Sequence, residues 1–187
     1  MAWDSIHGSD FVKRIMSFRR FRDILECWHW YNAENMRLAE RAAKNKEDPF
    51  SSIEPFLEML SNNFTGAFTC GQKIDVDESC FSFKGRHRAR CFNAKKPAKY
   101  HLKAYCLNDA STGYLHSFFM YRGKDEKRPN SWSATEYPVL RLLVELFWNK
   151  GYILCLDWYT SLSLVIRLIQ LGIDVVGTVR LNKKNLP

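Results

Sequence analysis

The chain has 187 residues, of which 46% are hydrophobic and 14% aromatic, so it can bury a sizeable core and is not a disordered protein. Its formal net charge of +8 at pH 7 favours a polyanionic partner, nucleic acid before a membrane surface. No uncharged apolar run approaches the ~18 residues of a membrane-spanning helix, and the N-terminus lacks the features of a signal peptide.

The first 72 residues are predicted to be helical. In residues 11–30, apolar side chains recur close to every 3.6 positions, which predicts a helix with a break near Phe18. Residues 32–46 are polar and predict a loop or a short exposed helix, and another helix follows over residues 48–63. The aromatic side chains of this region are expected to be core residues.

A basic segment follows an alternating, strand-like stretch that begins at Lys73. Residues 84–103 contain eight Lys or Arg residues, aromatic side chains between them, and no acid. This arrangement predicts a nucleic-acid-binding surface, and the alternative is a solvated basic face. The candidate DNA-binding residues are Lys84, Arg86, Arg88, Arg90, Lys95, Lys96, Lys99 and Lys103.

Residues 100–121 predict a β-hairpin whose turn is the cluster Asn108–Gly113. Asp109 stands where the first strand ends. A carboxylate held there by rigid backbone suits a metal ligand or a general base. The alternative is an ordinary turn residue, because Asp is common in turns.

The last third alternates helices and strands. Residues 135–147 predict a helix that Gly151 terminates in the left-handed region, and residues 152–156 predict a buried strand. A helix over residues 160–172 and a strand over residues 174–179 follow. This order predicts an α/β fold, in which a helical N-terminal region precedes an incomplete RNase H-like mixed sheet with flanking helices.

Six cysteines occur without a CxxC spacing, and two lie in apolar, strand-like runs. This usage is typical of buried, reduced thiols in an intracellular protein. It indicates neither a disulfide framework nor a zinc site.

Four groups of motifs carry a resemblance to a known family. They are Ile74-Asp75-Val76-Asp77-Glu78 with Phe83-Lys84-Gly85-Arg86, Lys95-Lys96-Pro97-Ala98-Lys99-Tyr100, Asp109 with Thr112-Gly113-Tyr114, and Trp158-Tyr159-Thr160-Ser161 with Gly177-Thr178-Val179-Arg180. From about residue 11 onwards, the sequence resembles the piggyBac-type transposases and the host proteins derived from them. The resemblance implies a helical dimerisation and DNA-binding region at residues 1–72 and a partial RNase H-like domain of the DDE transposase type at residues 73–187.

The resemblance also implies a two-metal site, in which three aspartates hold Mg²⁺ ions for DNA strand cleavage and transfer. It assigns Asp109 as the first of these metal-binding, catalytic aspartates. Without a gap, Leu156 takes the position of the second, and Asp157 is a candidate displaced by one residue. The third is expected beyond Pro187, as is the cysteine-rich zinc module of the family.

The function expected from these observations is that of a piggyBac transposase-derived DNA-binding protein, catalytically inactive as this chain and without a functional Mg²⁺ ion. Its expected partner is duplex DNA, with a homodimer as a further candidate and no membrane, and the family implies a nuclear location. One alternative is a metal-dependent DNA transposase completed by a C-terminal continuation. The other is a protein-interaction module.

Overall fold

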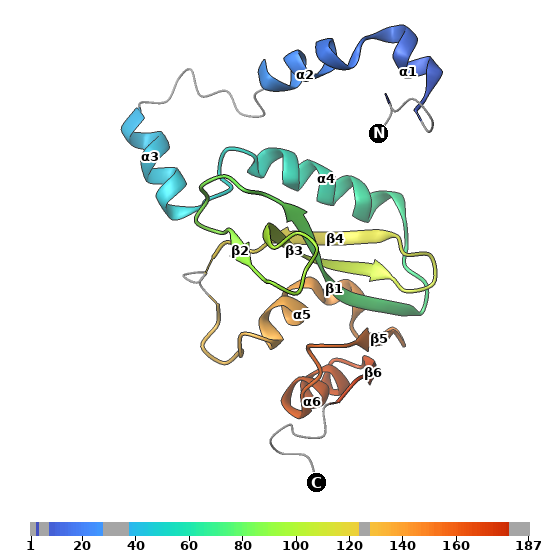
Figure 1. Cartoon of the computed structure of the whole chain (residues 1–187). Helices are drawn as coiled ribbons and strands as arrows, with labels where there is room; N and C mark the ends of the chain where they lie inside the picture. Colours follow the sequence, from blue (N-terminus) through green and yellow to red (C-terminus); the bar gives the residue numbers. More distant parts are fainter. Residues whose placement is uncertain (1–2, 4–7, 28–37, 124–127, 180–187) are drawn as a thin grey trace. The chain divides into compact units, whose positions relative to one another are not determined.

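The computed structural model describes residues 3, 8–27, 38–123 and 128–179 (Figure 1). The chain divides into two compact units, Met1–Arg37 and Leu38–Pro187. The boundary predicted between residues 72 and 73 falls inside the second unit, so the two helices that precede the sheet belong to the same unit as the sheet. As a division of function, that boundary stays a prediction.

The first unit contains two short helices, α1 (Asp10–Ile15) and α2 (Phe18–Cys27). The chain becomes extended at Met16, where the break was predicted. The indole N–H of Trp3 donates to the carbonyl oxygen of Met16 at 2.9 Å, and its ring contacts Phe18 and Phe21. The remainder of the predicted helix, residues 28–30, lies outside the described residues.

The second unit is a mixed sheet with flanking helices, which confirms the predicted fold class. The elements are α3 (Leu38–Glu47), α4 (Glu54–Ala67), β1 (Lys73–Ser82), β2 (Cys91–Phe92), β3 (Tyr100–Asp109), β4 (Leu115–Met120), α5 (Glu136–Leu142), a 3₁₀ turn (Glu145–Phe147), β5 (Ile153–Leu156), α6 (Leu162–Gln170) and β6 (Asp174–Gly177). β1 pairs antiparallel with β3 and parallel with β5, β5 pairs parallel with β6, and the strand order is β2-β3-β1-β5-β6 with β4 on β3.

Two helices differ from their predicted lengths. α4 continues past residue 63 because tertiary contacts hold its last turns, among them the Tyr114 hydroxyl that donates to the carbonyl oxygen of Phe64 at 3.0 Å. The helix predicted over residues 135–147 is divided, because Leu143 leaves the helical region and its carbonyl oxygen accepts from the indole of Trp148. Gly151 has the predicted positive φ, 72°.

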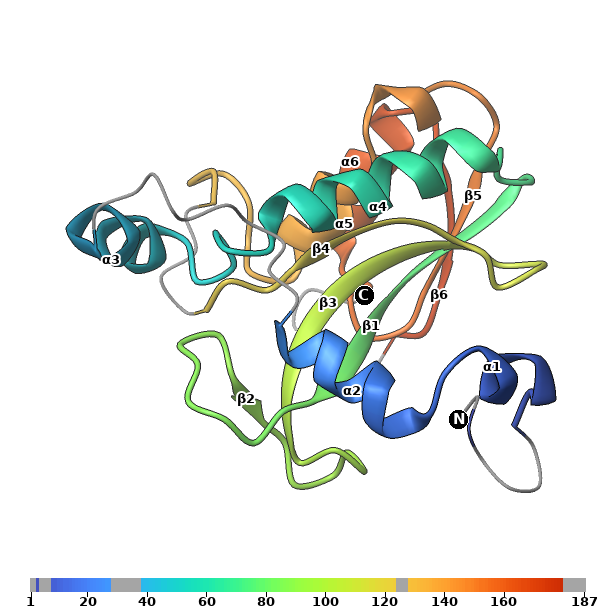
Figure 2. The same cartoon turned by 90° about the horizontal axis from the view of Figure 1, so that it is seen from above.

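Each face of the sheet packs against a different set of helices. Ile74, Val76 and their neighbours on β3 and β5 pack against α5, the 3₁₀ turn and α6. The opposite face packs against Phe50 and the beginning of α4, which runs alongside β4 in both ribbon views (Figure 1, Figure 2). The buried residues of this second cluster are Phe50, Ala89, Ala104, Cys106 and Met120.

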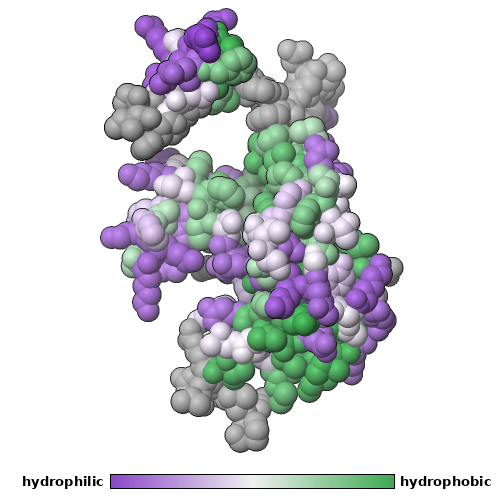
Figure 3. All heavy atoms as spheres, turned by 90° about the vertical axis from the view of Figure 1, so that its right-hand side faces the viewer, coloured by the Kyte–Doolittle hydropathy of each residue, from purple (hydrophilic) through white to green (hydrophobic). Residues whose placement is uncertain are grey.

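The sheet ends, within the described part of the chain, at β6, which pairs only with β5. Figure 3 shows apolar side chains gathered low on one face of the molecule, where the C-terminal elements lie. The exposed apolar side chains of α6 and β6 are Leu162, Ile166, Ile169 and Val176.

Neither a membrane span nor a disulfide occurs among the described residues. No helix there is long and apolar enough to cross a membrane. All six cysteines lie in the described part, and none is in a disulfide there. The expected burial holds for Cys70 and Cys106 only, since Cys80, Cys91 and Cys155 are half-buried and Cys27 is exposed.

An acidic cleft and a basic loop

A cleft of about 440 Å³ opens where β1, β5 and β6 lie side by side. The parallel strands β5 and β6 both end at this cleft, whereas β1 runs on past it to Ser82, and side chains beyond strand ends face open solvent. β1 contributes Asp75 and Asp77, and the end of β5 contributes Asp157. The cleft therefore collects three carboxylates from two neighbouring strands.

The pairing of the strands decides which residue at the end of β5 faces this cleft. Asp75 pairs with Cys155, and Asp77 and Asp157, each two residues further along the chain, both line the cleft. Leu156 points to the other face, where it is 5% exposed and part of the core. The displaced candidate, Asp157, is thus the side chain that lies in the cleft, and the Thr178 hydroxyl fixes it by donating to Oδ1 at 2.7 Å.

The candidate residues predicted from sequence did not include Asp75 and Asp77. The signal was present, since the alternation Ile74-Asp75-Val76-Asp77 places both aspartates on the solvent face of a strand. Asp75 is half-buried and accepts from the Asn108 amide at 3.0 Å. Burial raises the pKa of Asp75, the amide lowers it in part, and the nearby charges of Asp77 and Asp109 raise it again. A cation in the cleft would relieve this crowding of negative charge.

Asp109 lies elsewhere, at the hairpin turn between β3 and β4. It is 2% exposed and does not line the cleft. Its carboxylate accepts from the Thr112 hydroxyl and amide, both at 2.8 Å, and from the amides of Gly71 at 2.7 Å and Ser111 at 3.1 Å. The hydrogen bonds from Thr112, followed by that from Gly71, hold the pKa of Asp109 below its ordinary value.

These contacts are those of an aspartate that caps a turn, and the structure does not bring Asp109 and Asp157 together. Asp109 is level with Ile74, whose side chain faces the core, whereas Asp157 is on the cleft face. A metal-binding role for Asp109 stays a prediction. The four hydrogen bonds that Asp109 accepts occupy most of the lone pairs of its carboxylate, so few remain for a cation.

The oxygen donors of the cleft are of the chemical type that Mg²⁺ prefers. Asp77 and Asp157 are exposed, whereas Asp75 is engaged with Asn108. In the part of the chain that the structure describes, no group of three or more His, Cys, Asp or Glu side chains is placed to hold a metal ion. The cleft thus offers two exposed carboxylates, those of Asp77 and Asp157, as possible ligands.

A buried polar cluster lies on the other side of β1 from Asp77. Glu78 Oε1 accepts from the Tyr159 hydroxyl at 2.8 Å and from Lys103 Nζ at 3.1 Å. Burial raises the pKa of Tyr159, and the charge of Glu78 adds to the increase. Glu78, the residue after Asp77, is therefore hydrogen-bonded to Tyr159, which follows Asp157 by two residues.

Lys103 is consequently engaged inside the fold. Its ammonium lies 4.5 Å from the ring centroid of Tyr105 and 4.9 Å from that of Tyr121. Burial lowers the pKa of Lys103, but Tyr105 and Glu78 outweigh it, and the net pKa is raised. Lys103 stays protonated for an internal ion pair and is not available to a phosphate.

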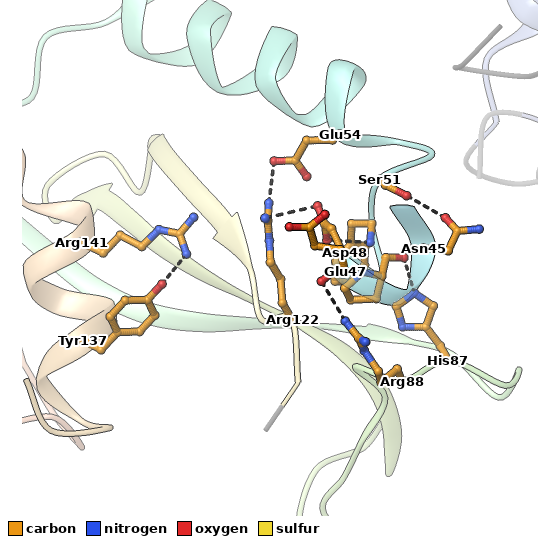
Figure 4. Close-up of polar contacts among 12 residues, drawn as sticks. Asn45, Glu47, Asp48, Ser51, Glu54, His87, Arg88, Arg122, Tyr137 and Arg141 are labelled. Atoms are coloured by element: carbon orange, nitrogen blue, oxygen red, sulfur yellow. Dashed lines mark hydrogen bonds and ion pairs between the residues drawn. The ribbon is translucent and has the colours of Figure 1, made fainter. Parts of the chain in front are cut away.

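Arg88 and Arg90 are engaged as well. The guanidinium of Arg88 donates to the carbonyl oxygens of Lys46 and Glu47 at the end of α3 (Figure 4). That of Arg90 donates to the carbonyl oxygens of Lys84 and Gly85, at 3.0 and 2.8 Å. The other five predicted DNA-binding side chains are exposed, and within the described residues no hydrogen bond or ion pair holds them; they are Lys84, Arg86, Lys95, Lys96 and Lys99.

The loop that carries these charges is anchored to the chain around α4. The amide of Ala89 donates to His87 Nδ1, so Nε2 carries the proton and donates to the carbonyl oxygen of Pro49 at 3.1 Å. Nearby, Arg122 pairs with Asp48 and Glu54 (Figure 4). His87 and Arg88 therefore attach the first part of the basic loop, the segment of residues 84–99, to the chain before α4.

Three comparisons relate the chain to known proteins. The family model for DDE transposases described as Transposase IS4 matches residues 1–187. The human PiggyBac transposable element-derived protein 3 is 27% identical over 154 residues, which are 78% of this chain and 25% of that protein. The human Chimeric ERCC6-PGBD3 protein is also 27% identical over 154 residues, 78% of this chain and 14% of that protein.

Among solved structures, the cryo-EM structure of a piggyBac transposase synaptic complex with hairpin DNA is similar, with a TM-score of 0.80 and 25% identity. The match covers 92% of this chain and 35% of that chain. The chain thus spans about a quarter of the first curated relative and about a third of the solved one.

Proposed function

The chain belongs to the Transposase IS4 family of DDE transposases, with piggyBac proteins among its relatives, and from this we propose that it binds duplex DNA through its basic loop. The observation that carries the proposal is the set of five exposed basic side chains between Lys84 and Lys99 that form no hydrogen bond or ion pair with another described residue. The solved relative is a transposase bound to hairpin DNA, which supports a nucleic acid as the partner.

The electrostatics of such a loop predict a steep salt dependence. Each phosphate that a Lys or Arg neutralises releases counterions, and log affinity then falls against log salt with a slope of about −0.9 per contact. Five contacts give a slope of about −4.5, a loss of roughly 500-fold between 50 and 200 mM salt. A protein-interaction module would show no such dependence with DNA.

The triple variant Lys95→Ala, Lys96→Ala, Lys99→Ala is expected to weaken duplex binding about equally for all sequences. It should also make the salt slope shallower by about three, because each lysine contributes about one contact. Fluorescence anisotropy with a labelled duplex over a range of KCl concentrations measures both quantities.

The matched control removes the same charge elsewhere. Lys73, Arg128 and Lys150 are exposed and lie outside the basic loop, so their combined replacement by alanine should leave most of the slope unchanged. Equal losses in the two triple variants would show that only net charge matters. Absence of duplex binding at low salt would leave the protein-interaction alternative.

We further propose that the acidic cleft holds a divalent cation weakly and that the chain does not cleave DNA by itself. Two-metal strand cleavage needs several carboxylates to hold both ions, and the cleft offers Asp77 and Asp157 with Asp75 already engaged. A bound Mg²⁺ would supply positive charge to phosphate oxygens, and Asp77 on β1 and Asp157 after β5 would hold it.

Titration with Mn²⁺ is expected to show binding in roughly the millimolar range, as for weak oxygen-ligand sites. Asp77→Asn and Asp157→Asn should each abolish it, because each removes one of two main ligands. Isothermal calorimetry or the electron paramagnetic resonance signal of free Mn²⁺ gives the affinity. Asp174→Asn, at the exposed beginning of β6, is the control.

Asp109→Asn separates the two assignments of the metal site. The Asp109→Asn variant should fold and bind Mn²⁺ as the native chain does. If Asp109→Asn abolishes Mn²⁺ binding and Asp77→Asn does not, Asp109 is the metal ligand, as the resemblance implies. Incubation with a transposon-end duplex and Mg²⁺ is expected to give no nicked product. Nicking that disappears in Asp77→Asn would show that the chain is active.

A further inference from the structure

One face of β1 is open from the acidic cleft to the far end of the strand. Asp77, Ser79 and Phe81 alternate on this face and are all exposed, Phe81 by 53%. Phe81 is level with Leu102 on β3, and the amide of Phe83 donates to the carbonyl oxygen of Tyr100. The exposed strip therefore leads from Asp77 towards Tyr100 along the same face of the sheet.

Two aromatic rings stand at the end of this strip. Phe92 and Tyr100 form a cross-strand pair between β2 and β3, with ring centroids 4.9 Å apart. Such a pair helps to hold β2 on the sheet. However, Phe92 is 61% exposed and Tyr100 is 46% exposed, so much of the ring surface remains open to solvent.

Positive charge surrounds the open rings. The guanidinium of Arg90 lies 5.1 Å from the ring centroid of Tyr100. Lys95, Lys96 and Lys99 are in the loop that joins β2 to β3, and the amide of Asn93 closes it by donating to the carbonyl oxygen of Lys99 at 2.9 Å. Exposed rings that share a short loop with three exposed lysines suit a ligand that carries both a π system and phosphates.

We propose that Phe92 and Tyr100 form a stacking platform for an unpaired nucleobase of DNA. This rests on the proposed DNA binding, because the neighbouring lysines would hold the phosphates of the same strand. Bases inside a duplex are stacked on one another and cannot reach the rings, whereas a base in an overhang, a loop or a frayed end can. The platform thus selects DNA with unpaired nucleotides over blunt duplex.

The position of the platform relates it to the cleft. Tyr100 is level with residue 83, six residues along β1 from Asp77, which corresponds to roughly 20 Å at about 3.3 Å per residue. A strand whose unpaired base stacks on the platform can therefore extend along the exposed face of β1 to the carboxylates. The platform would hold the end of a DNA substrate at a fixed distance from the cleft.

The test compares a blunt duplex with the same duplex that carries a short single-stranded overhang containing a fluorescent adenine analogue. The 187-residue chain is expected to bind the overhang DNA about tenfold more tightly and to quench the analogue, because a stacked base adds affinity and loses fluorescence. The variant Phe92→Leu, Tyr100→Leu should lose the tenfold gain and the quenching and still bind the blunt duplex.

Two controls keep the result interpretable. Tyr100→Phe retains the ring and should retain the gain, and Ile169→Ala removes an exposed apolar side chain elsewhere and should change nothing. Circular dichroism checks that the double leucine variant is folded. If the double leucine variant has lost β2, the double variant Phe92→Tyr, Tyr100→Phe is used instead. It keeps an aromatic ring at both positions and must keep the tenfold gain in affinity for the overhang DNA; loss of the gain would overturn the platform.

Failure of the platform and failure of DNA binding give different results. Salt-dependent binding to the blunt duplex with no gain from the overhang overturns the platform alone. A gain that survives in the double leucine variant also overturns it. No binding to either DNA at low salt overturns the proposed function.

Discussion

Leu156→Asp is expected to lower the free energy of unfolding by about 4 kcal/mol, a large part of the stability of a domain. Leu156 is 5% exposed among the core residues between β5 and α6, and an aspartate there would place a carboxyl group in an apolar cluster without a partner. Urea denaturation followed by tryptophan fluorescence measures the loss.

Leu156→Met is the control for this substitution. It keeps the apolar character and nearly the volume of the side chain, so it should cost less than about 1.5 kcal/mol. An aspartate variant that is as stable as the methionine variant, and that binds Mn²⁺ more tightly than the native chain, would contradict the observed strand pairing. In that case residue 156 would be the metal ligand, as the alignment with the family implies when no gap is allowed.

Glu78→Ala is expected to lower the free energy of unfolding by about 3 kcal/mol. The substitution leaves the ammonium of Lys103 and the hydroxyl of Tyr159 without their shared acceptor, and breaking a buried ion pair costs about 3–5 kcal/mol. The side chains of Glu78 and Lys103 are 26% and 18% exposed to solvent, so the expected cost lies at the lower end of this range of about 3–5 kcal/mol.

Two further variants divide this loss between its causes. Tyr159→Phe removes one hydrogen bond and should cost about 1 kcal/mol. Adding Lys103→Met to Glu78→Ala removes the stranded charge and should recover part of the stability, because an apolar side chain needs no partner there. If Glu78→Ala costs no more than Tyr159→Phe, Lys103 does not depend on Glu78.

The sequence predicted the fold well because the apolar patterns of β1, β3, β5 and α6 are regular. Where it failed, a contact distant in the chain decided the structure. Asn62 and Asn63 are poor helix formers, yet α4 continues through them because its later turns pack against the β3–β4 hairpin.

The candidate sites were harder to predict for the same reason. The density of charge in residues 84–103 located the basic loop, but nothing local shows that Arg88 binds carbonyl oxygens some forty residues earlier. Likewise, the spacing of motifs cannot show which of Leu156 and Asp157 faces solvent. The pairing of β1 with β5 decides this, and the pairing of β1 with β3 places Asp109 level with Ile74, outside the lining of the cleft.

The neighbours Asp77 and Glu78 are both acidic, but they lie on opposite sides of β1, and we expect different constraints to act on them. A host copy released from its work on DNA would accumulate changes at Asp77 and Asp157, since neither is part of the core. The same copy would keep Glu78, Tyr159 and Lys103 for as long as it has to fold. Substitutions at Asp77 with Glu78 unchanged would therefore indicate that a lineage lost the acidic cleft while it kept the fold.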